Sequence, residues 1–242
     1  MNLKPFIAAL YIFLCHTLSA ATPDTLVVAV EAKANPGQAP EVAFARKLAN
    51  HLNTQFEPYL CPWARCLKAI ETGDADIILS VFETQDRKAA MAFVEPALAE
   101  HVIRFEFLQK KGKSIPLRDY QDLKRYTVIT QRGNKYFERF DTDDQLTKQS
   151  ATTYQKAVDM LLAERGELLI DLSITRRDLY LPASKLNQIR VSDYIHNETK
   201  AEYLAVSLKS KWRYQIGKLS DALQYLKRTG QVQKYIKANV IE

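Results

Sequence analysis

The chain has 242 residues, of which 47% are hydrophobic and 26% charged, and its mean hydropathy is −0.26. This composition is typical of a soluble globular protein and excludes a disordered, collagen-like or multispan membrane chain. The formal net charge is +6, but the basic residues are scattered and form no long run. We therefore expect no nucleic-acid partner. The length allows one large domain or two lobes of about 100 residues each.

The N-terminal segment 1–21 has the physical parts of a secretory signal peptide. Lys4 supplies a positive charge, residues 6–14 are an unbroken apolar run, and the small residues Ser19 and Ala21 are spaced as at a cleavage site. The apolar run is too short to span a bilayer, which takes about 20 helical residues. We expect cleavage after this segment and a protein that is free in the exported compartment. An uncleaved N-terminal anchor is the alternative.

Cys61 and Cys66 are the two cysteines beyond the predicted signal peptide. Their spacing is neither that of a redox-active C-x-x-C pair nor that of a zinc knuckle, and no histidine lies nearby. Cysteines this close usually pair in an oxidising compartment, so we predict a structural disulfide. The alternative is a pair of reduced thiols whose Cα atoms are too far apart to bridge. We predict no metal site.

The first elements after the leader alternate between strand and helix. In chain order they are a strand at 25–30, a helix from residue 40, a strand at 55–60, a helix from residue 62 to Gly73, and a strand at 76–81. The first and third strands are continuous apolar runs, which is typical of strands buried on both faces. In the first helix Phe44, Leu48 and Leu52 share one face. This order predicts a parallel sheet covered by helices.

The pattern then restarts after a polar boundary at 109–116. Residues 102–108 alternate as in an extended strand, and residues 201–208 form a second extended run. The other predicted elements are a helix at 119–125, a strand at 126–130, a helix opened by Gly133, a helix that starts after Thr152 or Thr153 and stops at Gly166, a strand at 168–172, a helix at 216–226 closed by Gly230, and a short last helix with Val232 and Ile236. The sequence thus predicts two similar α/β halves with two strands that cross between them.

The usual catalytic and cofactor motifs are absent from the sequence. There is no glycine-rich phosphate loop, no G-x-S-x-G elbow and no H-E-x-x-H pair. The histidines beyond the leader, His51, His101 and His196, lie far apart. We therefore predict a protein without a cofactor that is not an enzyme.

Four motifs follow one another between residues 62 and 97. They are Pro62-Trp63-Ala-Arg65, Gly73-Asp-Ala-Asp76-Ile-Ile, Thr84-Gln-Asp-Arg87 and Phe93-Val-Glu-Pro96-Ala97. In this order they resemble family 3 of the periplasmic solute-binding proteins, which deliver amino acids to ABC importers. The resemblance covers nearly the whole chain after the leader.

The resemblance implies a two-lobe α/β periplasmic binding protein of type II, or Venus flytrap, with two hinge-crossing strands. Residues 22–109 and 201–242 would form lobe 1, and residues 110–200 would form lobe 2. The ligand would lie in the cleft between them. Ligands of open parallel sheets bind beyond the carboxyl ends of the strands, which agrees with this position.

Arg87 matches the arginine with which the family grips the α-carboxylate of its ligand. A guanidinium fork fits a carboxylate bidentately, which suits that role. The alternative is a surface ion pair with Asp86 or Glu83.

Four further residues of the first lobe are candidates. Thr84 either caps the turn before Arg87 or donates to the ligand. Ser80 and Phe82 alternate along the approach, so one of them faces the cleft. Trp63 is a candidate to replace the aromatic residue that the family places in the first loop, although a tryptophan at a helix start is more often packed. Because that aromatic is missing, the ligand class stays open between an amino acid, a less polar ligand and a small organic anion that is not an amino acid.

In the second lobe Arg132 and Asn134 flank a glycine turn that would open a helix. Backbone N–H groups at such a start suit an anion, and Arg132 would add charge unless it is a solvated loop residue. Asp171 ends a strand and is the candidate for the ligand's ammonium. Because a shift of one residue reverses the facing of a strand residue, whether it faces the cleft is left open.

We therefore predict an exported, monomeric binding protein that captures a small polar solute, an amino acid, for an inner-membrane ABC permease. One alternative is a sensory module on the same fold that docks on a membrane receptor. The other is an exported lyase similar to cyclohexadienyl dehydratase, in which Glu31, Glu83 or Asp171 would serve as the acid.

Overall fold

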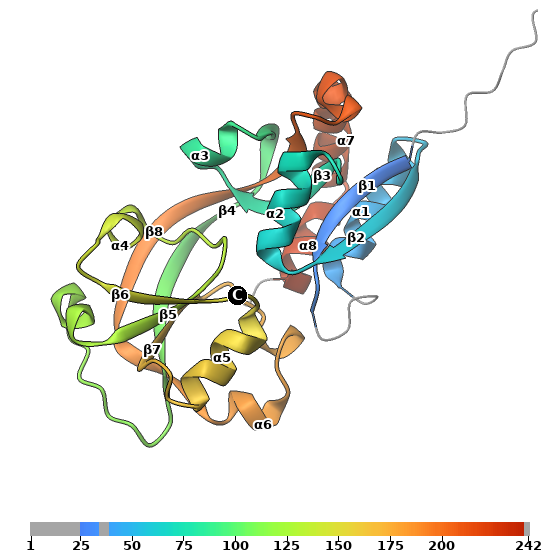
Figure 1. Cartoon of the computed structure of the whole chain (residues 1–242). Helices are drawn as coiled ribbons and strands as arrows, with labels where there is room; N and C mark the ends of the chain where they lie inside the picture. Colours follow the sequence, from blue (N-terminus) through green and yellow to red (C-terminus); the bar gives the residue numbers. More distant parts are fainter. Residues whose placement is uncertain (1–24, 34–38, 240–242) are drawn as a thin grey trace, which may run out of the picture.

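The computed structural model describes residues 25–33 and 39–239 (Figure 1). The predicted signal peptide lies outside the described residues. Within them, no helix combines the length and the apolar character needed to span a bilayer. The described strands form one eight-stranded sheet in the order β2-β1-β3-β8-β4-β7-β5-β6.

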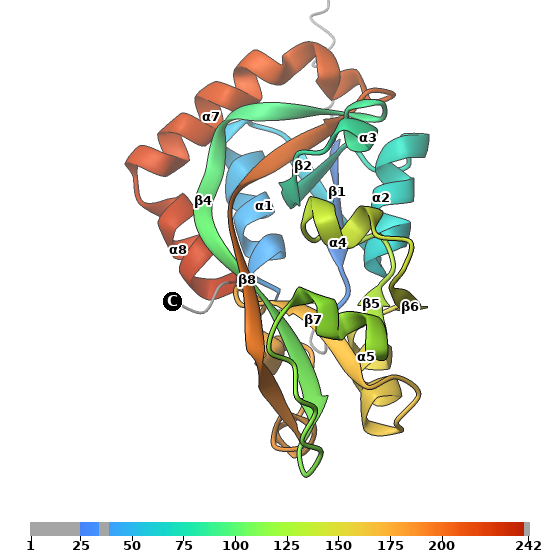
Figure 2. The ribbon, with the colours of Figure 1, turned by 90° about the vertical axis from the view of Figure 1, so that its left-hand side faces the viewer.

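The first lobe is built on parallel strands, as predicted. The strands are β1 (Thr25–Glu31), β2 (Gln55–Cys61) and β3 (Ile77–Phe82), and β1 lies between the other two. The helices are α1 (Pro40–His51), α2 (Trp63–Thr72), α7 (Ile216–Arg228) and α8 (Gln231–Asn239). Figure 2 shows α1, α7 and α8 on one side of these strands and α2 on the other. Each side has its own buried apolar core.

Two long antiparallel strands, β4 (Met91–Lys110) and β8 (Ile189–Ser207), run side by side through both lobes (Figures 1 and 2). The lower-numbered end of β4 pairs with the last residues of β8 near β3, and its other end pairs with β7. The predicted crossing strands at 102–108 and 201–208 are therefore confirmed in position but were too short. Pro96 and the charged residues around it interrupt the apolar alternation, so the sequence pattern hides the continuous strand.

The second lobe repeats the parallel arrangement with shorter elements. Its strands are β5 (Thr127–Gln131), β6 (Thr147–Ala151) and β7 (Leu168–Leu172), with β5 in the middle. Its helices are η2 (Tyr120–Arg125), α4 (Glu138–Thr142), α5 (Tyr154–Leu162), η3 (Arg177–Leu179) and α6 (Ala183–Leu186). The remaining short helices, α3 (Gln85–Lys88) and η4 (Lys211–Gln215), belong to the first lobe. β6 was not predicted, because its sequence TKQSA is polar and it lies at the sheet edge.

Local signals explain where several helices begin and end. Gly73 ends α2 with φ +86°, a left-handed conformation that glycine adopts without strain. The Thr153 side chain accepts a bond from the Lys156 N–H and caps α5, as predicted. α5 nevertheless ends at Leu162 rather than at Gly166. The prediction that Gly133 opens a helix is also wrong, since Gly133 lies in a turn and α4 begins only at Glu138.

Candidate functional site

A cavity of about 160 Å³ lies between the two lobes at the carboxyl ends of four strands. Glu31 ends β1 and Phe82 ends β3 in the first lobe, while Gln131 ends β5 and Leu172 ends β7 in the second, and all four line the cavity. This is where ligands bind in open α/β sheets. Among the described residues, no three metal-ligating side chains cluster there or elsewhere.

Arg87 lies in the cavity wall and is only 7% exposed. Its Nη1 donates to the Phe82 carbonyl (2.8 Å) and its Nη2 to the Gly133 carbonyl (3.0 Å) in the second lobe. The guanidinium carbon lies 5.8 Å from the centre of the Trp63 ring. Burial lowers the pKa of Arg87 to about 10, because the charged form loses hydration.

Arg87 has no ion-pair partner among residues 25–33 and 39–239. The surface ion pair considered from the sequence is absent, because Asp86 pairs with Lys135 (2.9 Å) and Glu83 pairs with Lys88. The guanidinium has five N–H groups, and the two bonds above occupy two of them. A buried cation thus keeps donors for an anion without having a bound carboxylate of its own.

Gly133 brings the second lobe against α2. Its carbonyl accepts from Trp63 Nε1 (3.1 Å) as well as from Arg87. A Cβ on Gly133 would come within 3.1 to 3.3 Å of Leu67, Ala64 and Trp63, and its φ of +86° is in the left-handed region. A glycine is therefore needed here for a close approach between lobes rather than for a helix start.

Ser80 and Phe82 both line the cavity, although only one of them was expected to face it. Ser80 has φ +52° at a register shift between β3 and β8, which places residues 80 and 82 on the same cavity. The Ser80 hydroxyl lies 2.7 Å from the Tyr235 hydroxyl. A strand irregularity of this kind is invisible in the sequence pattern.

Thr84 does not line the cavity. Its hydroxyl donates to Asp86 Oδ1 (2.6 Å) and makes no helix-cap bond. This bond, with the Lys135 ion pair, lowers the pKa of Asp86 to about 2. Thr84 therefore positions the α3 turn next to Arg87.

Of the three candidates in the second lobe, two line the cavity and one does not. Asn134 lines the cavity, whereas Arg132 is exposed and does not, as expected for a solvated loop arginine. Asp171 lines the cavity and is buried, which answers the question of its facing. Its Oδ2 accepts from Tyr154 (2.8 Å) and from Arg177 Nε (2.7 Å). Its charge is thus already balanced by Arg177, a partner that the sequence did not suggest.

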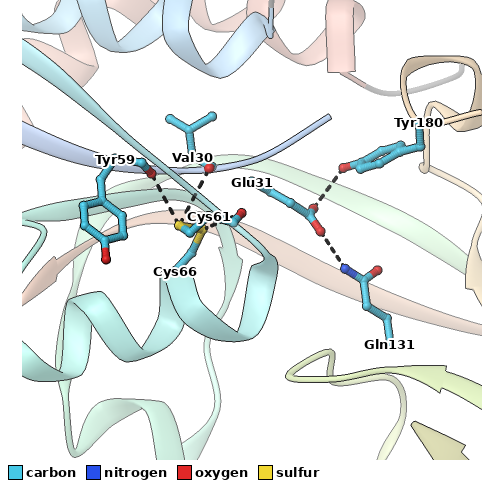
Figure 3. The surroundings of a disulfide bond; sticks show 7 residues. All are labelled: Val30, Glu31, Tyr59, Cys61, Cys66, Gln131 and Tyr180. Carbon is cyan, nitrogen blue, oxygen red and sulfur yellow. Dashed lines mark hydrogen bonds between the residues drawn. A yellow bond between two sulfur atoms is a disulfide. The ribbon is translucent and has the colours of Figure 1, made fainter. Parts of the chain in front are cut away.

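Glu31 joins the lobes through neutral donors of the second lobe. Figure 3 shows its carboxylate between Gln131 and Tyr180, and the distances are 2.5 Å from Gln131 Nε2 and 3.0 Å from the Tyr180 hydroxyl. Burial raises the pKa of Glu31. From the sequence, Glu31 was a candidate only as the acid of the lyase alternative, and neither of its partners was predicted. The position of Glu31 and Gln131 at strand ends was the available signal.

Apart from Ser80, a polar wall of the first lobe was not predicted from the sequence. It consists of cavity residues Lys33, Glu41, Ser80, Glu202 and Asn239, and we call it the first-lobe wall. Lys33 Nζ contacts Glu41 Oε1 at 2.6 Å and Asn239 Oδ1 at 2.7 Å. Glu202 is 4% exposed, and burial raises its pKa to about 7.

Cys61 and Cys66 form a disulfide with their Cα atoms 5.4 Å apart, so the predicted bridge is confirmed (Figure 3). The bridge ties the end of β2 to the first turns of α2. α2 begins with Trp63, so the bridge holds the helix end that carries a cavity residue.

The family model "Bacterial extracellular solute-binding proteins, family 3" matches residues 34–239. The chain belongs to this family. Among solved structures, a mutant of ArgBP from T. maritima is 17% identical, with a TM-score of 0.73 over 88% of this chain and 93% of that one. The chain therefore has the two-lobe fold of a type II periplasmic binding protein, as predicted. No curated protein matches the sequence significantly.

Two further structures have the fold of this family 3 protein. An amino acid ABC transporter substrate-binding protein from Streptococcus pneumoniae, bound to L-arginine, is 20% identical with a TM-score of 0.68, over 90% and 95% of the chains. A histidine kinase sensor domain with similarity to periplasmic binding proteins is 16% identical with a TM-score of 0.71, over 91% and 99%. At these identities the likeness establishes the fold alone.

Proposed function

We propose that this solute-binding protein is exported, captures an amino acid between its lobes and delivers it to an inner-membrane ABC permease. The lobes that close on the ligand would be residues 22–109 with 201–242, and residues 110–200. Arg87 would hold the carboxylate, while Trp63, Ser80, Phe82, Asn134 and Asp171 would line the rest of the site. The protein would act as a monomer without a cofactor.

The observation that carries this proposal is the buried guanidinium of Arg87, which borders the cavity and has no ion-pair partner in the described part of the chain. Removing a cation from water costs free energy that a bound counter-charge recovers. A ligand carboxylate supplies that charge and forms charge-assisted bonds with the remaining N–H groups. Since Arg87 also bonds Gly133 of the other lobe, a ligand on Arg87 would favour the closed arrangement.

The test is a thermal-shift screen of the purified mature chain against amino acids and small organic acids, followed by calorimetry on each hit. A ligand that binds only the folded protein raises the melting temperature by mass action. We expect at least one amino acid to bind with 1:1 stoichiometry. Failure of every amino acid, with binding of an organic acid that has no amino group, would contradict the amino-acid assignment.

The sensory alternative has one specific support, the structural likeness to a histidine kinase sensor domain. Capture of the ligand-loaded protein by a membrane receptor rather than by a permease would favour it. The lyase alternative is tested by following the turnover of prephenate or arogenate through product absorbance. We expect no turnover.

A further inference from the structure

We propose that the first-lobe wall is a subsite for a cationic group of the ligand, with Glu202 and Glu41 as its acceptors. The ligand would then be a basic amino acid or a related organic cation. This inference rests on the proposed function and narrows its substrate class.

Glu202 is the central group of this subsite. It lies in β8 opposite Phe82 of β3, is 96% buried since only 4% of it is exposed, and lines the cavity. The Ser80 hydroxyl is its hydrogen-bond partner. Among the described residues, no lysine, arginine or histidine forms an ion pair with it. Its carboxyl group thus borders the cavity without an ion pair among the described residues, and Lys33, the cation that interacts with it at longer range, is itself paired with Glu41.

Glu41 adds a second free acceptor. Its Oε1 contacts Lys33 Nζ, but its Oε2 is buried and has no hydrogen-bond partner within the described part of the chain. Buried carboxylate oxygens are normally bonded, and one without a partner indicates a missing donor. Lys33 is already bonded to Glu41 and to Asn239 Oδ1.

The charge balance of the region points the same way. Within the described part of the chain, the carboxylates of Glu31, Glu41 and Glu202 all interact with the one ammonium of Lys33. Glu31 takes its hydrogen bonds from the neutral Gln131 and Tyr180. The other groups of the wall, Ser80, Asn239 and the adjacent Tyr235, are neutral. A ligand ammonium or guanidinium would bring both the missing charge and the missing donors.

The first-lobe wall and Arg87 lie toward different faces of the first-lobe sheet. Arg87 contacts Trp63 of α2, whereas Glu41 is on α1 and Tyr235 is on α8, which cover the opposite face. A solute with a carboxylate at one end and a cation at the other would engage both. The arrangement therefore favours a basic amino acid over a neutral one of the same length.

Matched ligands test the charge without altering the protein. Calorimetry compares arginine with citrulline and lysine with norleucine, and adds agmatine as a cation without a carboxylate. We expect each cationic amino acid to bind at least tenfold more tightly than its neutral counterpart. Equal or tighter binding of the neutral counterparts would overturn the subsite but leave the proposed function standing. Binding of agmatine without any amino acid would support the subsite and contradict the function. No binding by any of these probes would overturn the subsite, and the screen of the remaining amino acids would then decide the proposed function.

Matched variants locate the effect in the wall. Glu202→Gln and Glu41→Gln should each reduce the arginine-to-citrulline preference at least fivefold. Glu100→Gln, which alters an exposed carboxyl on the neighbouring strand β4, should leave that preference unchanged. Circular dichroism and melting curves establish that each variant is folded. A wild-type preference in both folded wall variants would overturn the assignment of these two residues.

Discussion

Replacement of Arg87 by alanine separates ligand binding from stability. In the chain without ligand, the substitution removes two bonds from a charged donor to backbone carbonyls, each contributing roughly 1.5 kcal/mol or more. It also removes a buried charge, and the lowering of its pKa to about 10 corresponds to about 3 kcal/mol of unfavourable burial. These contributions nearly cancel. We expect the free energy of unfolding to change by no more than about 2 kcal/mol.

Binding should respond far more strongly. A ligand carboxylate in the variant would lose its charged partner inside a buried site, which costs about 2–5 kcal/mol. Because about 1.4 kcal/mol corresponds to a factor of ten, the Kd should rise by roughly thirty- to several-thousand-fold. Calorimetry with the ligand identified by the screen measures this, and urea unfolding of the same sample measures stability.

The matched control is Arg65→Ala, which removes an exposed arginine from the same helix that carries Trp63. It should change the Kd by less than about threefold, as surface substitutions usually do. An Arg87→Ala protein that is folded and binds with wild-type affinity would refute the reasoning, because the ligand carboxylate would then not depend on the buried Arg87 cation.

Three further predictions concern Trp63, the disulfide and Glu202. Trp63→Phe keeps a ring but loses the donor to Gly133, so calorimetry should show a loss of affinity of about 0.5–1.5 kcal/mol; a hundredfold loss would instead mean direct ring–ligand contact. Serine at both Cys61 and Cys66 should lower the free energy of unfolding in urea by about 2 kcal/mol, because a short loop is no longer closed; an unchanged urea midpoint would contradict this. Burial raises the pKa of Glu202 from 4.5 to about 7, so ionising it in the folded chain costs up to about 3 kcal/mol. The free energy of unfolding should therefore fall as pH rises from 4.5 to 7, and it should fall less steeply in Glu202→Gln. Equal pH slopes in the two proteins would contradict a raised pKa of Glu202.

The fold was predictable where burial dictates the residue pattern. β1 and β7 are buried on both faces, and their apolar runs place them to within one residue. The long strands β4 and β8 were harder, because each passes from one core through a polar hinge into the other. The alternation of apolar and polar residues that marks a strand is therefore interrupted where β4 and β8 cross the hinge.

The candidate site was predictable only where one short segment carries it. Arg87 follows β3 within a few residues, so its place near the cavity follows from the local order of elements. Arg132 is just as near a strand end, yet it points to solvent, because the Gly133 turn that follows is pressed against α2. The pairing of Asp171 with Arg177 likewise depends on how η3 folds back.

The first-lobe wall shows a different limit. Lys33 and Asn239 are 206 residues apart in sequence, and they meet only because α8 packs against α1. Glu202 is a single acid among the residues of a long strand and has no flanking motif. Only the three-dimensional packing reveals that these charges share one cavity.

The contacts between the lobes are weak one by one, and this determines what a ligand can do. The Lys135–Asp86 ion pair is partly exposed, and such pairs contribute about 0–1 kcal/mol. Glu31 and the Gly133 carbonyl are held by hydrogen bonds, which contribute on the order of 1 kcal/mol each, and more from a charged donor. Ordering the side chains that make these contacts offsets part of the gain. A ligand that neutralises Arg87 in the closed arrangement adds a contribution of equal or larger size. Its charge can therefore decide whether the lobes stay together, and a solute without that charge cannot.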